Sequence, residues 1–224
     1  MKRILAAAIV AAACPAVAQT AILQSPAYKE CSTLAASNPT KALVKADEWI
    51  NIDNGLAAQH CRAMALFGLH RFDEAATALS DLHDSVAPEN ITLRSYLTRQ
   101  AALASINATR TAEALALITT QIGEFSTIKT DNATIAKLTA ELLLDRARIH
   151  ITYGKLGDAM ADLDHAVSLS PIHEEVLLER AAVFEKLGDP ALARSDAEIV
   201  LKLNPRSTAA KALIARLSGP AKAK

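Results

Sequence analysis

Cysteine offers the most direct covalent chemistry in this sequence. Cys14 lies in an N-terminal apolar segment, Cys31 and Cys61 follow it, and the chain has no Cys-x-x-Cys motif. A dithiol redox centre is therefore not predicted. If Cys14 is removed with a signal segment, the two remaining cysteines form an even set, which pairs in an oxidising compartment. We predict a Cys31–Cys61 disulfide, and two buried free thiols are the alternative.

The histidines do not follow the spacing of a metal site. His173 precedes Glu174 and Glu175, as in the helix of zinc peptidases, but no second histidine follows four residues later, so two ligands cannot share one helix face. The other histidines are isolated along the chain: His60, His70, His83, His150 and His165. Neither a metal ion nor any other cofactor is predicted.

Nucleophilic catalysis has no local signature in the chain. A Gly-x-Ser-x-Gly elbow is absent, and the 7 glycines occur singly, so no loop of the type that cradles phosphates is present. We therefore predict a protein that is not an enzyme. A hydrolase whose serine, histidine and carboxylate converge only in the folded chain remains a less favoured alternative.

The composition favours a helix-rich globular chain. Of the 224 residues, 51% are hydrophobic but only 4% are aromatic, and 24 basic residues balance 24 acidic ones. A chain without positive charge excess and with few aromatic rings lacks the usual means of binding nucleic acid. Nucleic acid is therefore not expected among its partners.

The first eighteen residues have the features of a secretory signal. Lys2 and Arg3 precede an apolar run from Ile4 to Ala13, and Ala16 and Ala18 supply the small residues that signal peptidase requires. The apolar run is about 15 Å long as a helix, about half the hydrocarbon thickness of a bilayer, so a membrane span is not predicted. We predict cleavage after Ala18 and a periplasmic or secreted protein, with a lipid-modified Cys14 as the less favoured alternative.

A period of 34 residues organises the C-terminal half. The scarce residues coincide at this shift, since Gly154 aligns with Gly188 and Pro171 with Pro205. Apolar positions within each period recur at helical spacing and are interrupted once, at Gly188-Asp189-Pro190 in the last one. Each period is therefore predicted to be helix, turn, helix, with Asp189 as an N-cap. The same N-cap and proline pattern is expected at Asn38-Pro39, Ser170-Pro171 and Asn204-Pro205.

This pattern resembles the tetratricopeptide repeat. Its marker positions are the small residues Ala147 and Ala181, the turn glycines, Ala159 and Ala193, and the closing prolines. The resemblance implies an all-α, right-handed α-solenoid over residues 28–219, and a C-terminal capping helix at 206–218. Residues 19–27 would be a flexible leader and residues 220–224 a disordered tail. The repeat units are expected at about 28–51, 56–89, 95–128, 140–173 and 174–207, and the third of them lacks the turn glycine.

The same resemblance implies a concave groove, lined by the first helix of each unit, that accepts an extended peptide or a partner's helix. By register, the side chains expected to line it are His60, Met64, Phe67, Tyr96, Arg99, Leu103, Glu141, Leu144, Arg148, Ile151, Glu175, Leu178, Ala182 and Glu185. In this interpretation Arg99 and Arg148 pair with a carboxylate of the partner, whereas Met64, Phe67 and Tyr96 seat an apolar side chain.

The predicted function is a non-catalytic adaptor in the bacterial periplasm that binds another protein or peptide segment. A structural or assembly subunit of an envelope complex is the alternative, and the oligomeric state stays open. Arg62, Arg146 and Arg180 recur at one place in three units, and we expect them to pack through their aliphatic stems between repeats. The disulfide would pin the first unit, which has a neighbour on one side only.

Overall fold

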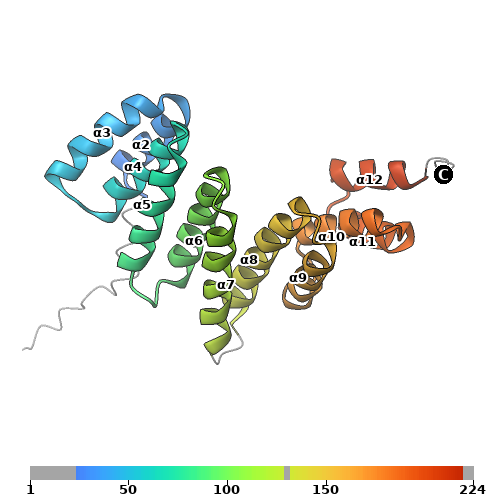
Figure 1. Ribbon diagram of the computed structural model, residues 1–224. Helices are drawn as coiled ribbons and strands as arrows, with labels where there is room; N and C mark the ends of the chain where they lie inside the picture. Colours follow the sequence, from blue (N-terminus) through green and yellow to red (C-terminus); the bar gives the residue numbers. More distant parts are fainter. Residues whose placement is uncertain (1–23, 129–131, 219–224) are drawn as a thin grey trace, which may run out of the picture. The chain divides into compact units, whose positions relative to one another are not determined.

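The computed structural model describes residues 24–128 and 132–218 (Figure 1). The predicted signal peptide 1–18, Cys14, most of the leader and the tail 220–224 lie outside the described residues. No helix within the described ranges is long and apolar enough to cross a membrane.

Every regular element of the described residues is an α-helix, as the sequence predicts. The helices are α2 (Pro26–Ser37), α3 (Pro39–Ile52), α4 (Leu56–Gly68), α5 (Phe72–Ser85), α6 (Ile91–Asn107), α7 (Thr111–Thr127), α8 (Ala133–Thr152), α9 (Leu156–Leu169), α10 (Glu174–Leu187), α11 (Pro190–Leu203) and α12 (Thr208–Ser218). The chain divides into two compact modules, an N-terminal one up to Leu97 and a C-terminal one from Thr98, so that α6 contributes to both.

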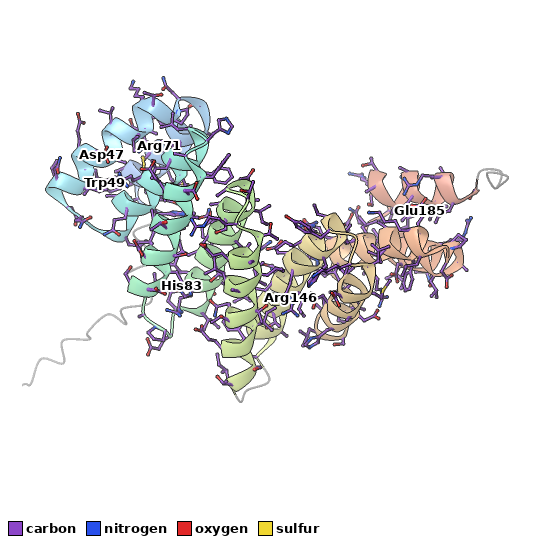
Figure 2. All side chains as sticks on the ribbon, in the orientation of Figure 1. Asp47, Trp49, Arg71, His83, Arg146 and Glu185 are labelled. Carbon is purple, nitrogen blue, oxygen red and sulfur yellow. A yellow bond between two sulfur atoms is a disulfide. The ribbon has the colours of Figure 1, made fainter. Side chains whose placement is uncertain are left out.

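The N-terminal module has a core of small side chains. Helix α2 packs against α3 and α4, and α4 also packs against α5. Cys31, Ala46 and Cys61 form one buried cluster, against which the half-buried Trp49 packs (Figure 2). Small side chains allow helix backbones to approach closely, which is why the alanine-rich sequence gives three helices in mutual contact.

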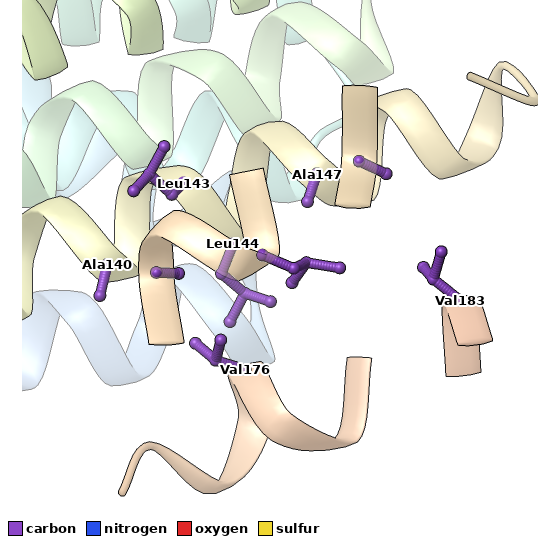
Figure 3. Close-up of a cluster of buried hydrophobic side chains, with 9 residues drawn as sticks. Ala140, Leu143, Leu144, Ala147, Val176 and Val183 are labelled. Atoms are coloured by element: carbon purple, nitrogen blue, oxygen red, sulfur yellow. The ribbon is translucent and has the colours of Figure 1, made fainter. Parts of the chain in front are cut away.

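The C-terminal module repeats one helix pair. Helix α8 packs against α9, α10 packs against both, α11 packs against α10, and α12 packs against α11. Leu143, Leu144 and Val176 belong to the buried cluster that joins α8, α9 and α10 (Figure 3). Each fully buried leucine contributes about 1.5–3 kcal/mol relative to an exposed one. The predicted capping helix is α12, which buries Ala210 and Leu213.

The N-caps follow the sequence prediction at two of the four expected places. The side chains of Asn38 and Asp189 accept hydrogen bonds from backbone amides of α3 and α11, and Pro39 and Pro190 are the first helical residues. Pro171 and Pro205, by contrast, precede α10 and α12, which begin at Glu174 and Thr208. The expectation that these two prolines open their helices is wrong, because backbone hydrogen bonds from His173 to Ser170 and from Ser207 to Asn204 close a turn there first.

Four helix pairs share one turn geometry. The residue two places before the second helix has a positive φ in each of them: His70 (58°), Thr109 (63°), Gly154 (72°) and Gly188 (85°). The amide of the following residue donates back to the last turn of the first helix, for example from Asp189 to the carbonyl of Phe184 at 2.9 Å and from Arg110 to that of Ser105 at 2.7 Å. This is the helix-terminating arrangement in which glycine is preferred. The unit at 95–128 therefore keeps the repeat's turn without its glycine.

The turns give a paired prediction on stability. Replacement of Gly188 with Ala should lower the free energy of unfolding by about 1 kcal/mol, because L-residues are strained at this φ. A Cβ at Gly188 would meet nothing within 4 Å, so the backbone alone causes the loss. Replacement of Thr109 with Gly should instead raise the free energy of unfolding, by up to about 1 kcal/mol. Urea denaturation followed by far-UV circular dichroism measures both, and equal stability of wild type and Gly188→Ala would contradict the explanation.

Candidate partner-binding surface

His60 does not face a groove. Its side chain is fully buried on α4, its Nδ1 lies 2.7 Å from the hydroxyl oxygen of Tyr28, and the two rings stack with centroids 5.7 Å apart. Burial raises the pKa of Tyr28 well above its usual range. The prediction of His60 as a groove residue is therefore wrong: together with Tyr28 it joins α2 to α4.

The other groove residues predicted in the N-terminal module differ in exposure. Met64 packs partly buried against the cluster formed by Ala35, Ala42 and Ala65. Phe67 is half-buried, and its ring meets the edge of Phe72 with centroids 5.1 Å apart. Tyr96 is 45% exposed, with its ring edge-on to His60. Of Met64, Phe67 and Tyr96, which were predicted to contact an apolar side chain of the partner, Tyr96 is the most exposed.

Cys31 and Cys61 lie against each other, with Cα atoms 6.0 Å apart. This separation is within the range that a disulfide spans. Both side chains are fully buried between α2 and α4, next to Tyr28 and His60 along each helix. The geometry therefore permits the bond that the cysteine count predicts.

In the C-terminal module, Arg99 is held by two carboxylates of α8. Its Nε donates to Asp145 at 2.5 Å, and its Nη1 donates to Glu141 at 2.7 Å. Burial by itself would lower the pKa of Arg99, but the hydrogen bond to Asp145 and the charges of Asp145, Glu141 and Glu175 together raise it. Arg99 therefore ties α6 to α8, and its guanidinium is already paired within the chain.

Arg148 makes the corresponding connection between α8 and α10. Its Nε donates to Glu179 at 3.1 Å, its Nη2 lies 3.4 Å from Glu175, and its Nη1 lies 3.8 Å from Asp145. At the far end of α10, both oxygens of Glu185 accept from Arg216 of α12 at 2.8 and 2.6 Å. That hydrogen bond lowers the pKa of Glu185. Arg99 and Arg148 were expected to await a partner's carboxylate, and they instead have carboxylates of the chain itself.

The apolar members of the predicted groove also separate into buried and exposed groups. Leu144 is 1% exposed and belongs to the core, and Ile151 and Leu178 pack partly buried against core clusters. Leu103 and Ile106 of α6 remain 50% and 37% exposed. Leu103 stands one helical turn after Arg99 on the same face. We refer to the surface formed by Arg99, Leu103 and Ile106 with Glu141, Asp145, Arg148, Glu175 and Glu179 as the α6–α8–α10 face.

Two of the three recurring arginines form ion pairs with buried aspartates, which the sequence analysis did not predict. Arg180 donates to both oxygens of Asp196 at 2.8 Å. Arg146, which is labelled in Figure 2, donates to both oxygens of Asp162 at 2.9 and 2.6 Å. These hydrogen bonds raise the pKa of each arginine. Asp162 and Asp196 are themselves one repeat period apart, which was the available signal. Packing through the aliphatic stems was therefore an incomplete interpretation.

Arg62 occupies the same repeat position but uses a different partner. Its Nε donates to Asp47 of α3 at 2.9 Å, and both side chains are more than a third exposed. An exposed pair of this kind contributes little to stability. The α4–α5 pair thus keeps the arginine and lacks the buried aspartate of the later pairs.

Among the described residues, no group of three histidine, cysteine or acidic side chains is placed to hold a metal ion.

The fold is that of tetratricopeptide-repeat proteins. YrrB, described as a tetratricopeptide-repeat protein with an unusual peptide-binding site, superposes with a TM-score of 0.54 at 12% identity, over 89% of this chain and 99% of that one. A tetratricopeptide-repeat protein from Parabacteroides merdae gives 0.54 at 20% identity, over 77% of this chain and 58% of that one. A thermophilic one from Thermus thermophilus gives 0.53 at 14% identity, over 85% and 98%. No model of a protein family and no curated protein matches the chain.

Proposed function

We propose that this chain is a non-catalytic adaptor of the bacterial periplasm, which binds a protein or peptide segment on the first helices of its repeats. The observation that carries the proposal is the α6–α8–α10 face. There, a repeat fold of the type used for protein interaction leaves Leu103 and Ile106 of α6 exposed, and Leu103 lies one helical turn after Arg99, which is paired with Glu141 and Asp145. Exposed apolar side chains ringed by polar ones mark interaction surfaces. YrrB, which has the same fold, is described as having a peptide-binding site, and this supports the proposed role.

A single substitution on this face tests the role. Leu103→Gln places a neutral polar side chain where an apolar side chain of the proposed partner packs, and we expect it to abolish the crosslinked complexes that the wild type forms in a periplasmic fraction. Leu192→Gln is the matched control, because Leu192 of α11 is similarly exposed, at 47%. If both variants and the wild type gave the same crosslinked species, this face would not be the binding surface.

The export part of the proposal rests on residues 1–18 and on the two remaining cysteines. We expect the mature chain to begin at Gln19 and to contain a Cys31–Cys61 disulfide, which an oxidising compartment favours. Mass spectrometry of the native protein and non-reducing peptide mapping measure both features. A lipid-modified Cys14 would contradict cleavage after Ala18, and alkylation of both Cys31 and Cys61 would contradict the bond.

A further inference from the structure

We infer that the segment bound by the α6–α8–α10 face is basic and carries a large apolar residue. This inference rests on the proposed function, and it names the chemistry of the partner. It departs from the sequence-based expectation, in which Arg99 and Arg148 receive a partner's carboxylate.

The first step is the state of the two guanidiniums. Arg99 is paired with Glu141 and Asp145, and Arg148 lies within 4 Å of Asp145, Glu175 and Glu179. Arg99 uses all three guanidinium nitrogens on its two carboxylates, so a further carboxylate would have to compete with them. Arg148 keeps N–H groups open to solvent, but a carboxylate that reached them would stand beside Asp145, Glu175 and Glu179 and be repelled by their charges. An acidic partner is therefore disfavoured at both arginines.

The second step is the charge balance. Two arginines face four carboxylates in this network, and Glu175 has the most exposed side chain of the four, at 63%. Lys137 precedes Glu141 by one turn of α8, and even with its ammonium counted the face keeps one carboxylate in excess. The Glu185 end of α10 is balanced by Arg216. The carboxylates have oxygen lone pairs left over, and a lysine or arginine of a partner can use them.

The third step is the apolar surface of α6 that follows Arg99. Leu103 lies one helical turn after Arg99, Ile106 lies about one turn further, and both are exposed. Asp145 of α8 contacts both Arg99 and Arg148, and Arg148 in turn contacts Glu175 and Glu179. A segment that places an apolar side chain over Leu103 and Ile106 and continues across α8 would therefore bring its basic side chains toward these carboxylates. Burial of the apolar side chain supplies affinity, and the surrounding charges set the preference for sign.

The test is a selection from a random library of displayed peptides of about 15 residues, which span roughly 22 Å as a helix. The mature wild-type protein is the bait, and peptides that also bind Leu103→Gln, which removes the apolar contact without changing the charge, are removed. We expect the retained peptides to carry more lysine and arginine than aspartate and glutamate, together with a large apolar residue. Retained peptides that are neutral or acidic would overturn this inference and leave the adaptor function standing. If no peptide depended on Leu103, both proposals would fail.

A quantitative measurement follows with one retained peptide in synthetic form. We expect the double variant Glu175→Gln/Glu179→Gln to weaken its binding about tenfold. Glu198→Gln is the control for loss of one charge elsewhere, since Glu198 is exposed on α11, and it should change the Kd less than about twofold. Unchanged affinity of the double variant, at an unchanged melting temperature, would contradict the assignment of these carboxylates. The sign of the selected peptides tests the inference independently, even if the double variant does not fold.

Discussion

Arg180→Met should lower the free energy of unfolding by about 3 kcal/mol, because it leaves a buried carboxylate without its partner. The side chain of Asp196 is 5% exposed and that of Arg180 17%, and two hydrogen bonds of 2.8 Å join them. Methionine keeps an unbranched apolar stem, but it also loses the guanidinium that lies 5.7 Å from the centroid of the Phe184 ring. Urea denaturation followed by far-UV circular dichroism measures the change.

A double-mutant cycle separates the ion pair from its surroundings. Arg180→Met/Asp196→Ala removes both charges, so we expect it to be more stable than Arg180→Met alone. Arg194→Met is the control, because Arg194 on α11 makes one hydrogen bond, to Ser218, and should change stability by less than about 0.5 kcal/mol. Additive effects of the two substitutions in the cycle would show that the pair carries no stabilising interaction of its own.

Removal of the disulfide should have an effect of similar size in the N-terminal module. For a loop of about 31 residues, the Cys31→Ala/Cys61→Ala variant should lose about 3.5 kcal/mol on the loop-entropy model. We expect the variant still to fold, because the hydrogen bond between Tyr28 and His60 holds α2 on α4 independently of the sulfur atoms. The loss should therefore appear as a lower denaturation midpoint with a native spectrum.

The fluorescence of Trp49 provides the measurement, because it is the only tryptophan and it packs against the cluster that contains both cysteines. Wild-type protein treated with a reductant should show the same shift as the double variant, apart from the packing change that the alanines introduce. Val44→Ala on the exposed side of α3 is a control that should leave the midpoint in place. If the reductant had no effect while the variant was destabilised, packing rather than a covalent bond would be responsible.

The sequence predicts the helical repeat well, because repetition multiplies a weak local signal. Gly188, Asp189 and Pro190 define a turn whose backbone conformation glycine, aspartate and proline each favour. Gly154 marks the same place one period earlier. A search for glycine does not find the turn at Thr109, because a threonine there has the positive φ of 63° that glycine would favour.

The exposure of the predicted groove residues was less predictable. The repeat register identifies the side of a helix on which a residue lies, but it does not identify which other helices cover that side. Leu144 and Leu103 both lie on the side expected to face the groove, and yet the first is in the core and the second is exposed. Helical spacing assigns Arg148 correctly to α8, but its carboxylate neighbours lie 27 and 31 residues away on α10. Such pairings depend on how far one helix is shifted along the next, which the spacing of residues within one helix does not determine.

The pairs between arginines and buried aspartates affect how easily a repeat unit could be added to this chain. Each of the last two periods contains both members of its own pair, Arg146 with Asp162 and Arg180 with Asp196. Arg180 also contacts Asp164 of the preceding period, and the position one period after Asp164 is the acidic residue Glu198. A tandem copy of residues 174–207 inserted after Ser207 would thus give the added copy of Arg180 an aspartate within its own period and Glu198 in the period before it. For this arginine, lengthening by duplication is electrostatically self-contained at this end of the protein, whereas Arg62 depends on Asp47 of α3, outside its own helix pair.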